Sequence, residues 1–356
     1  MIVPTSTIEI EKIAESRING IDFSNLPFGK VFADHIFEMD YKDGQWTSPK
    51  IRPYGPINLS PAASALHYGQ SIFEGMKAYR RPDGEVVMFR PEANFNRMNQ
   101  SADRMCMPHV NKELFFEGLR QLLTIDSSWI PFGEESSLYI RPVMFATDDF
   151  IGVRPSDTYK FLVFTCPVSG YYTKPVRVRI ETVYSRACEG GVGRAKAAGN
   201  YAAALFPARQ AQKVGYDQLV WTDARDHKFI EESGTMNIMF VINNVLYTPA
   251  LSGSILPGIT RDSVLRLARD WGMEVEETNV AVDFVINSLK NGELQEAFGV
   301  GTAATIAHID TIGYSGTDYK IPPIETREFS NKVSAYLQDL RMGRKPDQYN
   351  WMYHVK

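Results

Sequence analysis

A polar break near the middle of the chain constrains the fold more than any other feature of the sequence. Residues 169–175 hold a glycine, two tyrosines and a proline, and they separate two apolar segments that have the alternation of β-strands. The 356 residues are also too many for one ordinary hydrophobic core. We therefore predict two domains, at residues 1–169 and 176–356, joined by a linker at residues 170–175.

Both halves mix predicted strands with predicted helices, which indicates an α/β fold with some α+β character. In the first half, strands at residues 74–80 and 85–89 flank Arg81-Pro82-Asp83-Gly84, which is a hairpin signal. Two long strands are predicted at residues 137–147 and 159–168. Helices are predicted at residues 90–105, 112–123, 200–214, 260–271, 282–290 and 325–341.

Composition excludes several classes of function. The net charge is −4 without any basic run, so neither nucleic acid nor an anionic membrane is an expected partner. No apolar stretch reaches the roughly 18 residues that span a bilayer. Cys106, Cys166 and Cys188 are odd in number and widely spaced, which argues against disulfides and for a reducing cytoplasm. The six histidines lack metal-ligand spacing, so no metal site is expected.

The most informative segment places a lysine between glycine-rich backbone and the start of an alanine-rich helix. Residues 190–201 read Gly-Gly-Val-Gly-Arg-Ala-Lys-Ala-Ala-Gly-Asn-Tyr. Glycines let a backbone approach a ligand closely, and a desolvated lysine amine is nucleophilic toward carbonyl carbons. A P-loop does not fit, because its lysine follows glycine and precedes Ser or Thr, whereas Ala195 and Ala197 flank Lys196. From this segment alone, a surface lysine in a flexible loop remains the alternative.

Two later segments add a carboxylate and an anion site. Residues 232–237 read Glu-Ser-Gly-Thr-Met-Asn, and residues 256–261 read Leu-Pro-Gly-Ile-Thr-Arg. In the second segment, a Pro-Gly turn runs directly into a predicted helix. The amides of Ile259 and Thr260 then lie at the positive end of that helix, which attracts anions. Simple helix capping would explain the same residues.

Taken together and in this order, the three segments resemble the fold-type IV family of pyridoxal-phosphate (PLP) enzymes. That family contains branched-chain aminotransferases, D-amino acid aminotransferases and aminodeoxychorismate lyases. The resemblance extends into the first half, from about residue 30, and ends at about residue 340. Residues 66–79, 88–91 and 138–142 look like the branched-chain subgroup in particular, with Phe-Glu-Gly-Met-Lys-Ala-Tyr at 73–79 and Tyr-Ile-Arg-Pro at 139–142.

The resemblance implies a fold and a set of cofactor contacts. It implies a smaller N-terminal and a larger C-terminal domain, with PLP at their interface. Lys196 would attach the cofactor as a Schiff base and later move the proton between the substrate Cα and the cofactor C4′. Glu232 would face the pyridine nitrogen and keep it protonated, and Tyr201 would donate to the phenolic oxygen. Phosphate donors would be Arg90, Ile259, Thr260 and Thr302.

The resemblance also implies a substrate pocket that accepts both an aliphatic and an acidic side chain. Thr235, Ala303 and Tyr68 would hold the substrate carboxylate. Arg141 would bind the second carboxylate of glutamate, within tyrosine walls that offer an apolar face and a polar tip. The remaining wall residues would be Phe73, Tyr139 and Tyr171, with Ile151 and Val153 from a loop that reaches the neighbouring subunit's site. Each aromatic residue has plain core packing as its alternative explanation.

The sequence therefore predicts a PLP-dependent homodimer that moves amino groups between branched-chain amino acids and 2-oxoglutarate. A D-amino acid aminotransferase or an aminodeoxychorismate lyase of the same fold is the nearest alternative. A protein that binds a phosphate ligand without catalysis is an alternative of another class, because it would keep the anion site and have no use for Lys196.

Overall fold

The computed structural model describes residues 7–23, 26, 28–169 and 174–355. The chain divides into two compact units. Unit 1 holds Met1–Tyr171, Ala195–Ala198 and Gln338–Lys356, and unit 2 holds Tyr172–Arg194 and Gly199–Leu337. Much of the predicted linker lies outside the described residues, as does Tyr171. The C-terminal segment, assigned from sequence to the second domain, groups with unit 1 because its last strand pairs with a strand there.

Unit 1 is built on one nine-stranded sheet. Its strand order is β1-β3-β2-β8-β7-β5-β6-β18, and β4 pairs with β7 beside this path. All neighbouring pairs are antiparallel except β1 with β3. The strands are β1 (Glu9–Ile10), β2 (His35–Lys42), β3 (Gln45–Pro53), β4 (Ser71–Phe73), β5 (Met76–Arg80), β6 (Val86–Phe89), β7 (Ser137–Ala146), β8 (Tyr159–Val168) and β18 (Met352–His354).

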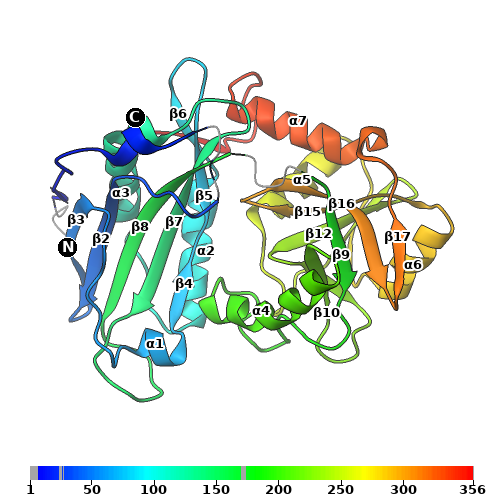
Figure 1. Cartoon of the computed structure of the whole chain (residues 1–356), viewed down its shortest axis with the longest axis horizontal. Coiled ribbons are helices and arrows are strands. Elements are labelled where there is room, and N and C mark those ends of the chain that lie inside the picture. Colours follow the sequence, from blue (N-terminus) through cyan, green and yellow to red (C-terminus); the bar gives the residue numbers. More distant parts are fainter. Residues whose placement is uncertain (1–6, 24–25, 27, 170–173, 356) are drawn as a thin grey trace. The chain divides into compact units, whose positions relative to one another are not determined.

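Helices α2 (Pro91–Arg104) and α3 (Lys112–Ile125) cover one face of this sheet (Figure 1). The core between them is aromatic, with the ring of Phe115 in contact with that of Phe161. Helix and sheet approach closely at Gly118, where an added Cβ would lie 2.3 Å from the Phe37 ring. A larger residue there would overpack the core at a cost of about 1–3 kcal/mol. The short helices of this unit are η1 (Arg17–Gly20), α1 (Ser64–Tyr68) and η2 (Ser127–Trp129).

Unit 2 contains a second nine-stranded sheet that closes on itself. The order is β11-β10-β9-β16-β15-β12-β13-β14, β17 pairs with β16, and an additional pairing of β11 with β12 closes a ring of six strands. Alternate residues such as Val176, Val178 and Ile180 of β9 are buried in its core. The strands are β9 (Val176–Ile180), β10 (Gln218–Thr222), β11 (Ile230–Ser233), β12 (Met236–Ile242), β13 (Val245–Pro249), β14 (Val275–Thr278), β15 (Leu294–Gly301), β16 (Thr305–Tyr314) and β17 (Thr317–Lys320).

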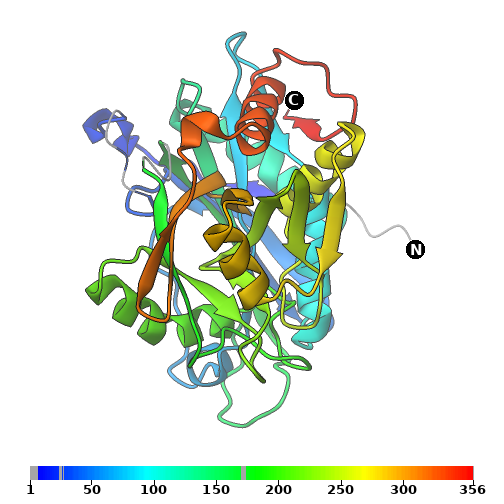
Figure 2. The same ribbon diagram turned by 90° about the vertical axis from the view of Figure 1, so that its right-hand side faces the viewer.

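The helices of the second half surround this ring. Helix α5 packs against β14 and β15, and α6 packs against β15 and β17 (Figure 2). Their bounds are α4 (Ala198–Lys213), α5 (Ile259–Asp270), α6 (Val282–Lys290), η3 (Ile324–Thr326) and α7 (Phe329–Arg341), of which the end of α7 belongs to unit 1. No helix among the described residues is long and apolar enough to cross a membrane.

One helix prediction was wrong at its start. The sequence predicts a helix from residue 325, but a 3₁₀ turn and then α7 from Phe329 are observed. The reason is tertiary: both oxygens of Glu296 accept the amide hydrogens of Phe329 and Ser330, at 2.8 Å each. That carboxylate caps a helix at this point, and Arg327 instead turns inward to donate to buried backbone carbonyl oxygens.

Candidate active site

Lys196 lies on a short stretch of backbone that is fixed within unit 1. Its amide donates to Ser101 Oγ in α2 at 2.9 Å, and its carbonyl oxygen accepts the amide of Phe73 at 3.1 Å. Ala197 also forms an isolated bridge with Ile72 of β4. The Lys196 amine is 4.9 Å from the centroid of the Phe73 ring. A residue from the middle of the sequence is thereby held by two elements of the first half.

A buried carboxylate lies beside this lysine. Glu74 is fully buried, and its two oxygens accept from Arg97 at 2.7 and 2.9 Å. Asn94 adds a third bond at 2.7 Å. Burial acts to raise the pKa of Glu74, but the charges of Arg97 and Lys196 and the Asn94 bond outweigh it, so that this pKa is lowered. The sequence showed Glu74 within a motif, but nothing in it pointed to the pairing with Arg97.

Arg90 occupies an unusual backbone position at the start of α2. Its φ of 49° and ψ of 44° are left-handed, although it is not a glycine. Its amide donates to the carbonyl oxygen of Trp351 at 2.7 Å, and its guanidinium lies 5.4 Å from the centre of the Trp351 ring. Left-handed backbone costs a non-glycine residue about 1–2 kcal/mol, so the local contacts must hold it. Strain of this kind clusters at ligand sites.

Three predicted pocket residues come together on the sheet of unit 1. The Arg141 guanidinium lies 4.5 Å from the centre of the Phe73 ring, and it donates to the Tyr139 hydroxyl at 2.9 Å. Arg141 Nε is buried and has no hydrogen-bond partner. Gly75 leaves room for Tyr139, because a Cβ there would lie 2.2 Å from the Tyr139 hydroxyl oxygen. The cluster therefore presents a cation within an aromatic frame.

The other predicted pocket residues of unit 1 lie exposed. Tyr68, at the end of α1, is 43% exposed. In the loop between β7 and β8, Ile151 is 66% exposed and Val153 is 90% exposed. These side chains are apolar and have little cover within the single chain. Their predicted roles stay predictions.

In unit 2, Glu232 has partners that the sequence did not reveal. The side chain is 3% exposed and lies on β11. One carboxylate oxygen is 3.2 Å from Nε of Arg186, and the other accepts the amide of Leu256 at 2.7 Å. Arg186 compensates the buried negative charge.

Residues of the 232–237 and 256–261 segments fix the backbone that leads into α5. Asn237 donates to the carbonyl oxygen of Leu256 at 3.0 Å, and a Cβ at Gly258 would lie 1.9 Å from its amide oxygen. Arg261 is buried and donates to the carbonyl oxygen of Pro249 at 2.9 Å. Helix α5 begins after Gly258 without a side-chain cap. The backbone is thereby set so that the positive end of α5 is available to an anion.

The remaining predicted residues of unit 2 lie on turns or at a helix start. Thr235 is exposed in the turn between β11 and β12, and Thr302 and Ala303 are half-buried in the turn between β15 and β16. Ile259 and Thr260 are buried in the first turn of α5, and Tyr201 is half-buried in α4. The described residues contain no group of three or more His, Cys, Asp or Glu that could hold a metal ion.

Comparisons with known proteins agree with this geometry. The family model of class IV amino-transferases matches residues 71–312. Branched-chain-amino-acid aminotransferase 2 of Bacillus subtilis (strain 168) is 46% identical over 353 residues, which cover 98% of this chain and 97% of that relative. The branched-chain amino acid aminotransferase of Escherichia coli has a TM-score of 0.72 at 26% identity, and the match covers 91% of this chain and 99% of that chain.

A further solved structure is the branched-chain aminotransferase of the thermophilic archaeon Thermoproteus uzoniensis with norvaline. It has a TM-score of 0.73 at 24% identity, and the match covers 90% of this chain and 100% of that chain. At this identity the likeness concerns the fold. Together with the E. coli structure it confirms the predicted fold class.

Proposed function

Because the chain belongs to the class IV aminotransferase family, we propose that it moves the amino group between L-leucine, L-isoleucine or L-valine and 2-oxoglutarate, with PLP as its cofactor. The observation that carries the substrate class is the cluster of Phe73, Tyr139 and Arg141. It offers an apolar frame to an aliphatic side chain and a cation to the side chain of glutamate.

The residues present suit PLP. Lys196 has the amine that an aldehyde cofactor requires, and Glu232 has a buried carboxylate whose charge suits a protonated pyridine nitrogen. Tyr201 supplies a hydroxyl for the phenolic oxygen. The phosphate would be held by Arg90, by Thr260 and Ile259 at the start of α5, and by Thr302. When bound, PLP supplies an electron sink for the substrate Cα.

The chain's own residues then bind, orient and move protons. With PLP bound, Lys196 Nζ would be the acid–base group that moves the proton of the substrate Cα. Glu232 favours the protonated form of the ring nitrogen, because an opposite charge stabilises a charged group. Thr235, Ala303 and Tyr68 hold the substrate α-carboxylate. Arg141 binds the second carboxylate of glutamate, for which its buried Nε has a donor to offer.

Peptide mapping after borohydride reduction tests the central assignment. We expect the purified chain to be yellow with PLP and to carry the reduced label on Lys196 alone. Lys196→Ala should lose both the label and L-leucine turnover, whereas Lys213→Ala, at the exposed end of α4, should keep both. A chain that stays colourless with PLP would favour a phosphate-ligand binding protein instead.

A comparison of amino donors tests the substrate class. We expect turnover of L-leucine with 2-oxoglutarate and none of D-alanine or aminodeoxychorismate. The reverse pattern would point to one of the other activities of this fold.

We also propose that the chain works as a homodimer. The support is the apolar surface at Leu66, Ile151 and Val153, which are 62%, 66% and 90% exposed in the single chain. In the dimer, the loop with Ile151 and Val153 would line the neighbouring subunit's pocket. Sedimentation should give twice the chain mass, and Ile151→Asp with Val153→Asp should weaken both assembly and L-leucine turnover. A monomer with full activity would contradict this proposal.

A further inference from the structure

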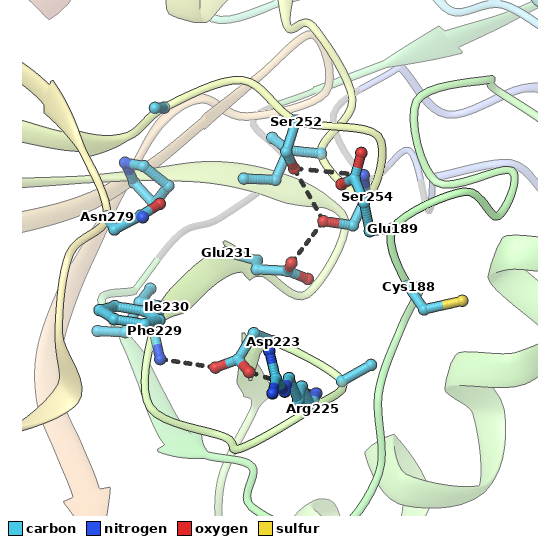
Figure 3. Close-up of a pocket in the computed structure, with 14 residues that line it drawn as sticks. Cys188, Glu189, Asp223, Arg225, Phe229, Ile230, Glu231, Ser252, Ser254 and Asn279 are labelled. Atoms are coloured by element: carbon cyan, nitrogen blue, oxygen red, sulfur yellow. Dashed lines mark hydrogen bonds between the residues drawn. The ribbon is translucent and has the colours of Figure 1, made fainter.

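Unit 2 contains a cavity of about 420 Å³ beside strand β11. Glu231 is the extra residue of a β-bulge in β11, because Ile230 and Glu232 on either side of it pair with Thr222 and Trp221 of β10. Glu231 lines the cavity together with residues from four loops, among them Glu189, Asp223, Ser252 and Ser254 (Figure 3). Among the described residues that line the cavity, none has a role in the proposed function.

Glu231 carries a buried oxygen without a partner. The residue is 9% exposed, and Oε1 accepts the hydroxyl of Ser254, whereas Oε2 has no hydrogen-bond partner. Burial, the largest influence, raises the pKa of Glu231, although Ser254 and Arg186 act to lower it. A buried acceptor without a donor destabilises the folded chain, so a donor that reached Oε2 would be favoured.

Two further carboxylates line the cavity. Glu189 accepts the amide of Gly253 at 3.0 Å. Asp223 accepts backbone amides, among them those of Lys228 at 2.7 Å and Phe229 at 2.8 Å. Ser252, Ser254 and Asn279 add neutral polar atoms to the lining. Three carboxylates around one hollow give it a negative potential, which favours a cation.

The shape and spacing favour an organic cation over a metal ion. Among the residues that the structure describes, no three His, Cys, Asp or Glu side chains lie close enough to cage a metal. The walls include apolar groups, namely Phe229, Ile230, Pro249 and Ile255. Arg225 also contributes to the lining, but its side chain is 92% exposed and lies 3.9 Å from the carboxylate of Asp226. It therefore points its charge into solvent.

We propose that this cavity binds a small organic molecule with a primary ammonium group and a short aliphatic body, with the ammonium on Glu231 Oε2. A primary ammonium has three donors, which can serve Oε2, Glu189 and a serine oxygen together. The aliphatic part would pack on the apolar walls. This site goes beyond the proposed transamination, and it needs neither Lys196 nor the substrate pocket.

The cavity is also connected to the proposed cofactor acid. The carbonyl oxygen of Ser254 accepts from the Arg186 guanidinium, and the same guanidinium lies 3.2 Å from Glu232. Two residues after Ser254, the amide of Leu256 donates to Glu232. A ligand that displaces Ser254 would thus act on Arg186 and on Leu256, which each contact Glu232.

The test is calorimetric titration of n-butylammonium chloride into the holoprotein after borohydride reduction. Reduction removes the aldehyde, so the amine probe cannot react at the proposed cofactor. We expect saturable binding in the millimolar range to the wild-type chain. Glu231→Gln should bind at least about tenfold more weakly, because a charge-assisted hydrogen bond is lost. Glu276→Gln, an exposed acid on β14, is the matched control and should bind as the wild type does.

Three results would overturn the proposal: no saturable binding, equal binding by wild type and Glu231→Gln, or equal saturation by potassium or magnesium chloride alone. Thermal unfolding of each variant establishes that it is folded before titration. Saturation transfer from the protein to the probe's methyl protons adds a second readout, which should vanish in Glu231→Gln. The outcome is independent of the proposed function, because a chain without bound PLP is titrated in the same way.

Discussion

Glu74 in unit 1 and Glu231 in unit 2 are both buried carboxylates, but they differ in how many of their oxygens accept hydrogen bonds. Both oxygens of Glu74 are occupied, by Arg97 on one and by Arg97 and Asn94 on the other. Glu231 has Ser254 on one oxygen and nothing on the other. Their pKa values accordingly move in opposite directions, lowered for Glu74 and raised for Glu231. A buried carboxylate whose two oxygens both accept hydrogen bonds stabilises the fold. A buried carboxylate with an oxygen that accepts none can still bind a ligand's donor.

Arg141 shows the same contrast for a cation. Its terminal nitrogen donates to Tyr139, and its Nε is buried without a partner. We assign a glutamate carboxylate to this open donor and an ammonium group to the open acceptor of Glu231. Arg97 serves only the framework by comparison. A variant of a fully paired residue such as Arg97 should therefore lower stability. A variant of Arg141 or Glu231, which each have an atom without a hydrogen-bond partner, should instead weaken ligand binding.

The largest effect is expected from Arg97→Met. It leaves the Glu74 charge buried without its main partner, which costs about 3–5 kcal/mol of the free energy of unfolding. Urea denaturation followed by circular dichroism measures this loss. Arg104→Met, on the exposed face of the same helix, is the control and should stay within about 0.5 kcal/mol of the wild type. A loss below about 1 kcal/mol for Arg97→Met would show that pairing of Glu74 is not structural.

The next effect, from Arg141→Met, concerns selectivity. The variant loses a charge-assisted contact worth about 1.5–3 kcal/mol, so kcat/KM for glutamate should fall roughly tenfold to a hundredfold. L-leucine brings no second carboxylate, and its kcat/KM should change less than about threefold. Half-reactions with each amino donor, followed by absorbance of the cofactor, separate the two. Equal losses for both donors would mean that Arg141 shapes the pocket without recognising the acid.

Lys77 differs from Glu74 and Glu231 because it is a base, and its lowered pKa favours the neutral form of the side chain. Burial, and then the neighbouring charge of Arg341, lower its pKa to about 7. Between about pH 7 and pH 10.5, Lys77 is protonated in the unfolded chain but not in the folded chain. Lys77 therefore makes the free energy of unfolding rise with pH in this range. Lys77→Met should flatten the rise in unfolding temperature between about pH 7 and pH 9 by a few degrees. Parallel pH profiles for wild type and variant would contradict the lowered pKa.

The sequence was sufficient for elements with strong local patterns. Strand β8 and helix α6 have the predicted bounds, because apolar alternation and an Asn-Gly stop signal are local features. The break before α7 was missed because its cause, Glu296, is distant in sequence. For the same reason no motif revealed that Arg97 pairs with Glu74 or that Arg186 pairs with Glu232. Motifs predicted which residues carry chemistry, and the structure shows which side chains lie beside Glu74 and Glu232.

The smallest effect is expected from Glu231→Gln in the absence of ligand. The folded-state pKa of Glu231 is raised, so its contribution to stability is present below the ordinary value of 4.5 and is lost as pH rises through the folded-state pKa. Glutamine keeps the Ser254 bond and removes the charge, and it should stabilise the chain by up to about 1 kcal/mol at pH 8 and by less at pH 4.5. Thermal unfolding at the two pH values measures the difference. For Glu74 the pKa is lowered, so its contribution to stability is lost as pH falls. If Glu231→Gln instead lowered the stability of the chain, and most strongly at pH 8, Glu231 would be a structural acid like Glu74.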